Sequence, residues 1–177
     1  AADSSLNIDD FRANERTFQI LTQVAGRAGR ENLPGKVIIQ TYNPDNIAIE
    51  LSSRQDYNSF FDTEIMLRKQ LKYPPFCDII VVGITAKDEI EVIKTAEKMH
   101  KKLKQKIIDK KIGLLLYKPV PAPIDRIKNK YRWRIIIKCV YNEQINNLLN
   151  CTLNEMYEET KNKETNIIVD LNPNNMS

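Results

Sequence analysis

Several residue types that mark particular protein classes are scarce in this chain of 177 residues. Its three cysteines are odd in number and never spaced as Cys-x-x-Cys, so we expect no metal site in the chain. Unpaired thiols fit a reducing, cytoplasmic compartment. The single histidine, His100, excludes any mechanism that needs two histidines from one copy. Five glycines are too few for collagen-like or linker sequence.

Long hydrophobic runs are absent too. The longest runs from Ile79 to Ile84, far below the roughly 20 residues of a membrane helix. The first ten residues show no basic segment followed by an apolar stretch, so no signal peptide is expected. With 42% hydrophobic and 28% charged residues, the composition predicts a folded, soluble protein without a membrane partner.

Positive charge is concentrated in one part of the chain, although the net charge is only +4. Between Lys98 and Arg134 there are thirteen basic residues and two acidic ones. Such an excess favours a polyanionic partner, and nucleic acid first. For the lysines from Lys98 to Lys106 the alternative is a helix face that is merely solvated.

The first part of the chain has the pattern of an incomplete domain. Apolar residues at helical spacing predict a helix over 15–28, and Asp56 to Leu71 predicts another with Phe60 and Phe61 inward. Asp45 can cap a helix between them. Residues 36–41 read as a buried parallel strand, which needs neighbours that this segment does not supply. We therefore expect the chain to be part of a longer protein.

The second part has a simple order of elements. Strands are expected at 77–85, 113–118, 131–140 and 166–171, with helices after Asp88 and over 143–158. The order β-α-β-β-α-β is that of a ferredoxin-like domain, and the overall class is α+β. Tyr73-Pro-Pro-Phe76 stops the preceding helix. The expected division is 1–55, a connecting segment 56–75, and a domain over 76–177.

The segment Gln23-Val-Ala-Gly26-Arg27-Ala-Gly29-Arg30 is the sharpest motif. On a helix, its Gln and two Arg side chains lie within about 60° of one another, and Arg16 and Gln19 extend this acid-free face. Such arginines can meet phosphate oxygens, and the glycines let another surface come close. Alternatively, the arginines complement the helix dipole and a glycine ends the helix. A GxxG loop of an RNA-binding module fits the flanks poorly.

A second basic motif joins two expected strands. The loop from Ala122 to Lys130 leads into a strand whose residues alternate between a basic and an apolar face. Trp133, on the apolar face, either stacks on an unpaired base or packs in the core. The candidate contacts to a DNA backbone are Arg126, Lys128, Lys130, Arg132 and Arg134.

The first motif resembles QxxGRxGR, the sixth conserved motif of superfamily-two helicases. Its flanks narrow the resemblance to replication-restart helicases of the primosomal protein N′ (PriA) family. The segments that resemble this family are Asp10-Phe-Arg-Ala-Asn-Glu-Arg-Thr-Phe-Gln19, Gly35 to Tyr42, Glu64 with Arg68, Tyr73 to Phe76, Pro119 to Pro123, Tyr131 to Arg134, and Val169 to Pro173. They cover essentially the whole chain.

The resemblance implies a role for each residue of the first motif. Arg30 would act as an arginine finger at the γ-phosphate of ATP, and Arg27 would make a second phosphate contact. Gln23 would bind the nucleotide or position the attacking water. Gly26 and Gly29 complete the motif. The family's Walker loop, its Mg²⁺-binding motif and its zinc module would lie upstream, so this chain alone is expected to be inactive and to bind no cofactor.

The resemblance also implies the fold and the partners. Residues 1–55 would be the C-terminal part of a RecA-like helicase lobe, and residues 76–177 a domain that resembles a small-subunit ribosomal protein. The whole would be a bacterial 3′-to-5′ helicase, an ATP hydrolase of DNA replication that recognises branched or single-stranded DNA at stalled forks. It would load the primosome together with other primosome proteins and single-strand-binding protein. A stand-alone nucleic-acid-binding module is the alternative, and a protein-interaction scaffold is a third reading.

Overall fold

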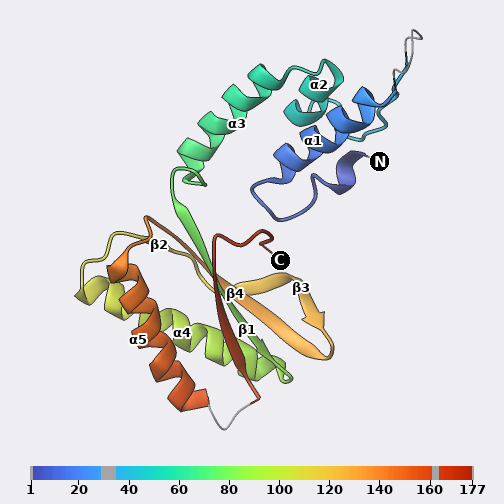
Figure 1. Cartoon of the computed structure of the whole chain (residues 1–177). Coiled ribbons are helices and arrows are strands. Elements are labelled where there is room, and N and C mark those ends of the chain that lie inside the picture. The colour runs from blue at the N-terminus through green and yellow to red at the C-terminus, as the bar shows by residue number, and fades with distance from the viewer. Residues whose placement is uncertain (1, 29–34, 161–163, 177) are drawn as a thin grey trace. The chain divides into compact units, whose positions relative to one another are not determined.

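The computed structural model of the chain describes residues 2–28, 35–160 and 164–176 (Figure 1). The chain divides into two compact units, Ala1–Leu71 and Lys72–Ser177, called here the N-terminal and C-terminal units. The described elements of the first are helical, whereas the second combines helices with an antiparallel sheet. The class is therefore α+β.

The N-terminal unit is built from α1 (Ala13–Gly26), α2 (Ile47–Ser53) and α3 (Tyr57–Leu71), after a short 3₁₀ turn at Ala2–Ser4. Its core is small. The rings of Phe18 and Phe60 stack with centroids 4.3 Å apart, and Ala48 and Leu51 of α2 complete the buried cluster. A cluster of four buried residues gives this unit little apolar stabilisation.

Three expectations for this unit are wrong. Phe60 is buried as expected, but Phe61 is 48% exposed, because it lies on the other side of the helix. Residues 35–41 form no strand, and the side chain of Ile38 is 82% exposed. A strand is stabilised by pairing, and the described part of this unit offers no strand to pair with. The cap of α2 is Asn46 rather than Asp45, because Asn46 adjoins the first helical residue and its side chain accepts a hydrogen bond from the Ala48 N–H at 2.9 Å.

The C-terminal unit contains one sheet and two long helices. The strand order is β2-β4-β1-β5, every described pair is antiparallel, and β3 pairs with β4 alone. In chain order the elements are β1 (Asp78–Ala86), α4 (Glu89–Asp109), β2 (Leu115–Leu116), β3 (Val120–Ile127), β4 (Lys130–Cys139), α5 (Glu143–Thr160) and β5 (Asn166–Leu171).

The core of this unit lies between the sheet and its two helices (Figure 1). On β1, Ile80, Val82 and Ile84 alternate toward the helices, and each is fully buried. The helix α4 begins, as predicted, at Asp88, whose carboxylate accepts from the Ile90 N–H at 3.0 Å. Its apolar stripe then covers the strands.

The segment expected to be a basic loop is a β-hairpin. Residues 120–127 form β3, and a two-residue turn at Lys128 and Asn129 leads into β4. Both turn residues have positive φ, 49° and 58°, a geometry that matches the twist of two paired strands. Pro121 and Pro123 argued against a strand, but β3 bonds to one neighbour only, and proline is tolerated on such an edge.

Candidate nucleotide and nucleic-acid sites

The end of α1 presents the described part of the first motif. The helix ends at Gly26, and the backbone N–H of Arg27 then donates to the Val24 carbonyl at 3.2 Å. The side chains of Gln23 and Arg27 are exposed. A Cβ atom at Gly26 would meet nothing within 4 Å, so its backbone is open to approach. Arg30 and Gly29 lie outside the described residues.

The acid-free helix face is shorter than the sequence indicated. Arg16 Nη2 lies 3.3 Å from a carboxylate oxygen of Asp10, just before the helix. The amide of Gln19 donates to Glu15 at 3.2 Å, one turn earlier. The helical spacing of the Arg and Gln residues did not indicate that either acid lies beside them. Of the five donors predicted to form this row, Gln23 and Arg27 are the described ones that stay clear of carboxylates.

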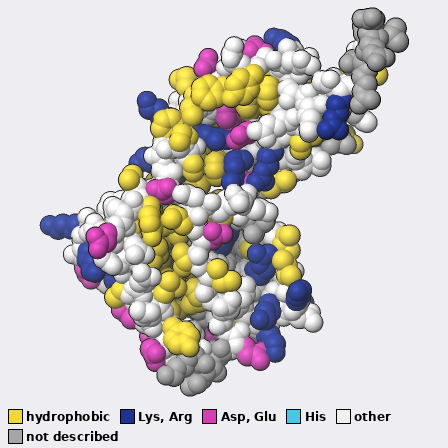
Figure 2. Space-filling view, in the orientation of Figure 1, with side chains coloured by type: hydrophobic (Ala, Val, Ile, Leu, Met, Phe, Trp, Pro, Cys, Tyr) yellow, Lys and Arg dark blue, Asp and Glu magenta, His cyan; other side chains and the backbone are white. Residues whose placement is uncertain are grey.

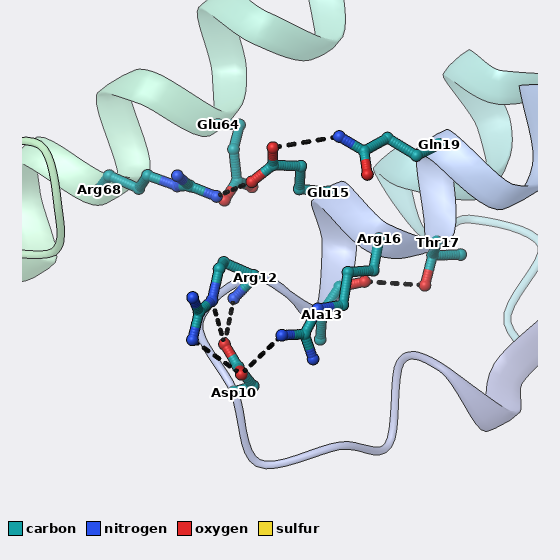
Figure 3. A network of polar contacts seen from close by, with 9 residues as sticks. All are labelled: Asp10, Arg12, Ala13, Glu15, Arg16, Thr17, Gln19, Glu64 and Arg68. Atoms are coloured by element: carbon teal, nitrogen blue, oxygen red, sulfur yellow. Dashed lines mark hydrogen bonds and ion pairs between the residues drawn. The ribbon is translucent and has the colours of Figure 1, made fainter. Parts of the chain in front are cut away.

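Around the first half of α1 lies a network of charged side chains (Figure 3). The guanidinium of Arg68, on α3, donates from Nη2 to Glu15 at 2.7 Å and from Nε to Glu64 at 2.9 Å. It also lies over the ring of Phe11, 5.1 Å from the centroid. Burial alone would lower the pKa of Arg68, but the two carboxylates outweigh it and raise that pKa above its ordinary value. Sequence reasoning had noted these residues only as family landmarks.

A second carboxylate fixes the entry to α1. Asp10 is buried and accepts hydrogen bonds from the backbone N–H and the Nε of Arg12, at 2.9 and 3.0 Å. Burial would raise the pKa of Asp10, yet the hydrogen bonds from Arg12 and the nearby charge of Arg16 lower it below its ordinary value. This carboxylate therefore stays ionised and paired at neutral pH.

In the C-terminal unit the predicted DNA contacts lie on the β3–β4 hairpin. Lys and Arg side chains gather over it at the lower right of Figure 2. Lys128 and Lys130 are exposed at the turn, and Arg126 covers the ring of Tyr131 at 5.0 Å. Arg132 donates to the Ile124 carbonyl at 3.2 Å across the hairpin. These four cations, called here the hairpin cations (Arg126, Lys128, Lys130 and Arg132), form one local group.

Arg134, the fifth predicted contact, lies apart from them. Its side chain is buried and donates to the backbone carbonyl of Met176 in the C-terminal tail. A phosphate can reach this guanidinium only if the tail is displaced. The predicted alternation of β4 is nevertheless confirmed, because Arg132 and Arg134 face away from the helices while Trp133 packs against the core opposite Ile84.

Three lysines of the lysine-rich helix α4 pair with acids of α5. Lys102 donates to Glu155 at 2.9 Å, and Lys98 pairs with Glu159 at 2.8 Å. Hydrogen bonds from Lys106 and then Lys102 lower the pKa of Glu155 to about 2. The sequence count of charge over 98–134 missed these acids because they follow some 50 residues later. The hairpin cations lie outside these pairs, as do Lys101 and Lys104 of α4.

The residues that the structure describes contain no group of three or more His, Cys, Asp or Glu placed to hold a metal ion. None of the described helices is both long and apolar enough to cross a membrane.

Comparisons with known proteins give a consistent set of relatives. Residues 69–174 match the family model described as Primosomal protein N C-terminal domain. A protein named Replication restart protein PriA from Bacillus subtilis (strain 168) is 40% identical over 174 residues, which is 98% of this chain and 21% of that protein.

Proteins of the same name occur among relatives from other bacteria. The one from Synechocystis sp. is 42% identical over 78% of this chain and 16% of its own length. The one from Chlamydia pneumoniae is 37% identical over 85% of this chain and 20% of its own length. The chain therefore spans about a fifth of the curated relatives that it matches.

Proposed function

Since the chain belongs to the family of the primosomal protein N C-terminal domain, we propose that it is the C-terminal part of an ATP-dependent superfamily-two DNA helicase of replication restart. Its relatives named Replication restart protein PriA support this over nearly the whole chain. In this proposal the N-terminal unit is the tail of a RecA-like lobe that faces ATP, and the C-terminal unit holds forked DNA. The parent enzyme moves 3′ to 5′ and loads the primosome.

The C-terminal unit is proposed to be a ferredoxin-like domain. What supports this is the order of β1, α4, β2, β4, α5 and β5, which follows β-α-β-β-α-β, together with the sheet order β2-β4-β1-β5. The strand β3 is then an addition that turns the central connection into a hairpin. A likeness to a small-subunit ribosomal protein follows from the same family resemblance.

At the nucleotide, Arg27 and Arg30 would supply preplaced positive charge to the γ-phosphate. Phosphoryl transfer spreads negative charge over the transferred group, and fixed guanidinium groups lower the barrier without reorganising. Arg30 is proposed as the finger, Arg27 as a second contact and Gln23 as a hydrogen-bond partner of the nucleotide or the attacking water. Gly26 and Gly29 would let the backbone come close. ATP and Mg²⁺ would be held mainly by the rest of the parent protein, as would its zinc.

The hairpin cations carry the DNA part of the proposal. Three exposed cations, together with the half-buried Arg132, lie on one hairpin and suit a row of phosphates, which set affinity without reading sequence. Single-stranded bases are usually held by stacking on exposed aromatic rings. The two aromatics of β4, Tyr131 and Trp133, are instead packed against the core. At the hairpin itself, this supports contacts to the phosphate backbone of a fork rather than stacking on its unpaired bases.

The test compares two charge-matched variants of the full chain. Changing the four hairpin cations to Ala should weaken binding to forked and duplex DNA alike, and should lower the slope of log K against log salt by about 3 to 4. The control set, Lys94, Lys101, Lys104 and Lys110, is exposed on or just after α4. Fluorescence anisotropy should show much smaller losses for it. Equal losses from both sets would mean a diffuse field, and no loss from the hairpin set would end the proposal.

A further inference from the structure

The helix α1 is held at one end and open at the other. Its buried residues are Thr17 and Phe18, both in the first half. In the second half, Gln23 is exposed and Val24 is 55% exposed. The direction in which the Gln23–Arg27 end points is thus set, within this unit, by what holds the first half.

Apolar packing alone does not hold that half tightly. A pocket of about 160 Å³ lies between α1 and α3, beside Phe18, Phe60 and Phe61. Close-packed interfaces transmit position because they leave few voids larger than a water molecule. A half-open space of this size beside a four-residue cluster gives directional contacts a larger share in fixing the angle between the two helices.

Arg68 makes such contacts, in addition to the Asp10 pairs that fix the entry to α1. Its guanidinium reaches Glu15 of α1 with one nitrogen and Glu64 of its own helix with another, at 2.7 and 2.9 Å. The side chain of Arg68 is 15% exposed and that of Glu64 9%, so their pair is shielded from water and salt, whereas Glu15 is 37% exposed. A planar fork that binds two carboxylates fixes direction as well as distance.

We propose that Arg68 is a positioning residue for the nucleotide site. It holds Glu15, and through the rigid helix it sets where Gln23 and Arg27 point. Twelve residues separate Glu15 from Arg27, about 18 Å along a helix. A tilt of about 5° at the clamp would therefore move Arg27 by about 1.5 Å. This inference rests on the proposed function, in which Arg27 contacts ATP.

The first experiment measures position without activity. Hydrogen–deuterium exchange of the full chain is compared for the unchanged protein, Arg68→Gln and Arg54→Gln. Arg54 is the control because it makes an exposed pair with Glu50 at 2.8 Å in the same unit. We expect Arg68→Gln to raise exchange in residues 19–27, and Arg54→Gln to leave that segment unchanged. Glu15→Gln, which spares the pair between Arg68 and Glu64, should act like Arg68→Gln.

The pattern of exchange decides the outcome. A rise spread evenly over α1, α2 and α3 would show that Arg68 merely stabilises the unit, and would overturn the inference. Unchanged exchange in α1 would overturn it too. If Arg68→Gln does not fold, Glu15→Gln decides alone by the same criterion.

The second experiment measures turnover in the full-length helicase. Arg68→Gln should lower kcat for ATP hydrolysis by about 10- to 100-fold with little change in KM, because a misplacement of about 1 Å can cost up to about 10²-fold. Arg68→Lys should retain only part of the original kcat, since an ammonium group cannot bridge both carboxylates in one plane. Arg27→Ala distinguishes the nucleotide role of Arg27 from the positioning role of Arg68. Normal turnover in Arg27→Ala would refute the nucleotide role, whereas a loss there with normal turnover in Arg68→Gln would refute the positioning role.

Discussion

Each of the two units of this chain is stabilised internally by different contacts. The C-terminal unit buries a cluster of sixteen residues between its sheet and helices, whereas the N-terminal unit buries four. Both units bury charged side chains, but in the N-terminal unit these form ion pairs around its small core: Asp10 and Glu64 are buried, and Arg68 joins two carboxylates. The comparison teaches that directional contacts carry a larger share of the geometry where the apolar core is small.

The N-terminal unit also leaves large apolar side chains exposed. On α1 and α3, Ile20, Phe61 and Met66 are 51%, 48% and 63% exposed. In the proposed function the remainder of the helicase lobe would cover these side chains.

The largest expected effect would separate the chemistry of the two units. In the proposed full-length helicase, Arg30→Ala should lower the rate of ATP hydrolysis by about 10³-fold or more, because Arg30 is proposed to be the arginine finger. DNA affinity, assigned to the hairpin, should stay within twofold. Arg54→Ala, a change on the same unit, provides the control for turnover. Near-normal turnover in Arg30→Ala would remove this residue from the nucleotide site.

The next effect tests whether the units are stabilised independently. Ile137 is fully buried in the sheet, and Ile137→Ala should lower the free energy of unfolding of the C-terminal unit by about 2–5 kcal/mol. Phe18→Ala should cost a similar amount in the N-terminal unit alone. Trp133 is the single tryptophan, so its fluorescence in a urea titration reports the C-terminal unit. A shift of that transition by Phe18→Ala would show that the units unfold together.

The smallest effect concerns the ion pairs on the surface of the C-terminal unit. The pKa of Glu155 is about 2 in the folded chain, below its ordinary 4.5. The ion pairs of Glu155 therefore make their full contribution to the stability of the folded chain above about pH 5, and this contribution is lost as the pH falls toward 2. Because the pair is exposed, we expect less than about 1 kcal/mol. Glu155→Gln should flatten the loss of Trp133-reported stability between pH 5 and 3. An unchanged slope would assign that loss to other carboxylates.

Periodic patterns predicted the C-terminal unit well. The strand 166–171 and the helix after Asp88 agree with the structure, and so do the two faces of β4. Alternation and helical spacing are local, so they can be read from neighbours in sequence. The hairpin was missed because prolines weakened the strand pattern of β3 and its turn lacks the usual glycine.

Contacts between residues far apart in the chain could not be predicted from the sequence. Arg68 and Glu15 are 53 residues apart, and no local pattern pairs them. The same holds for the acids of α5 that pair with lysines of α4. The strand expected at 36–41 failed for a related reason, since its pattern assumed partners that the described part of the unit does not contain. Of the first motif, Gln23, Gly26 and Arg27 could be placed, and their roles stay predictions.

The two-residue turn of the hairpin has a consequence for how its length can change. Because side chains alternate along a strand, one residue inserted into β4 would exchange the faces on one side of it and bring Arg132 toward the core or Trp133 toward water. Two residues added to each strand preserve both faces and carry the turn about 6–7 Å outward. Strand β3 already absorbs three extra residues in the register shift between Pro121 and Arg126, so the constraint applies to β4. Among homologous chains, the length of β4 should keep its parity even where its sequence does not.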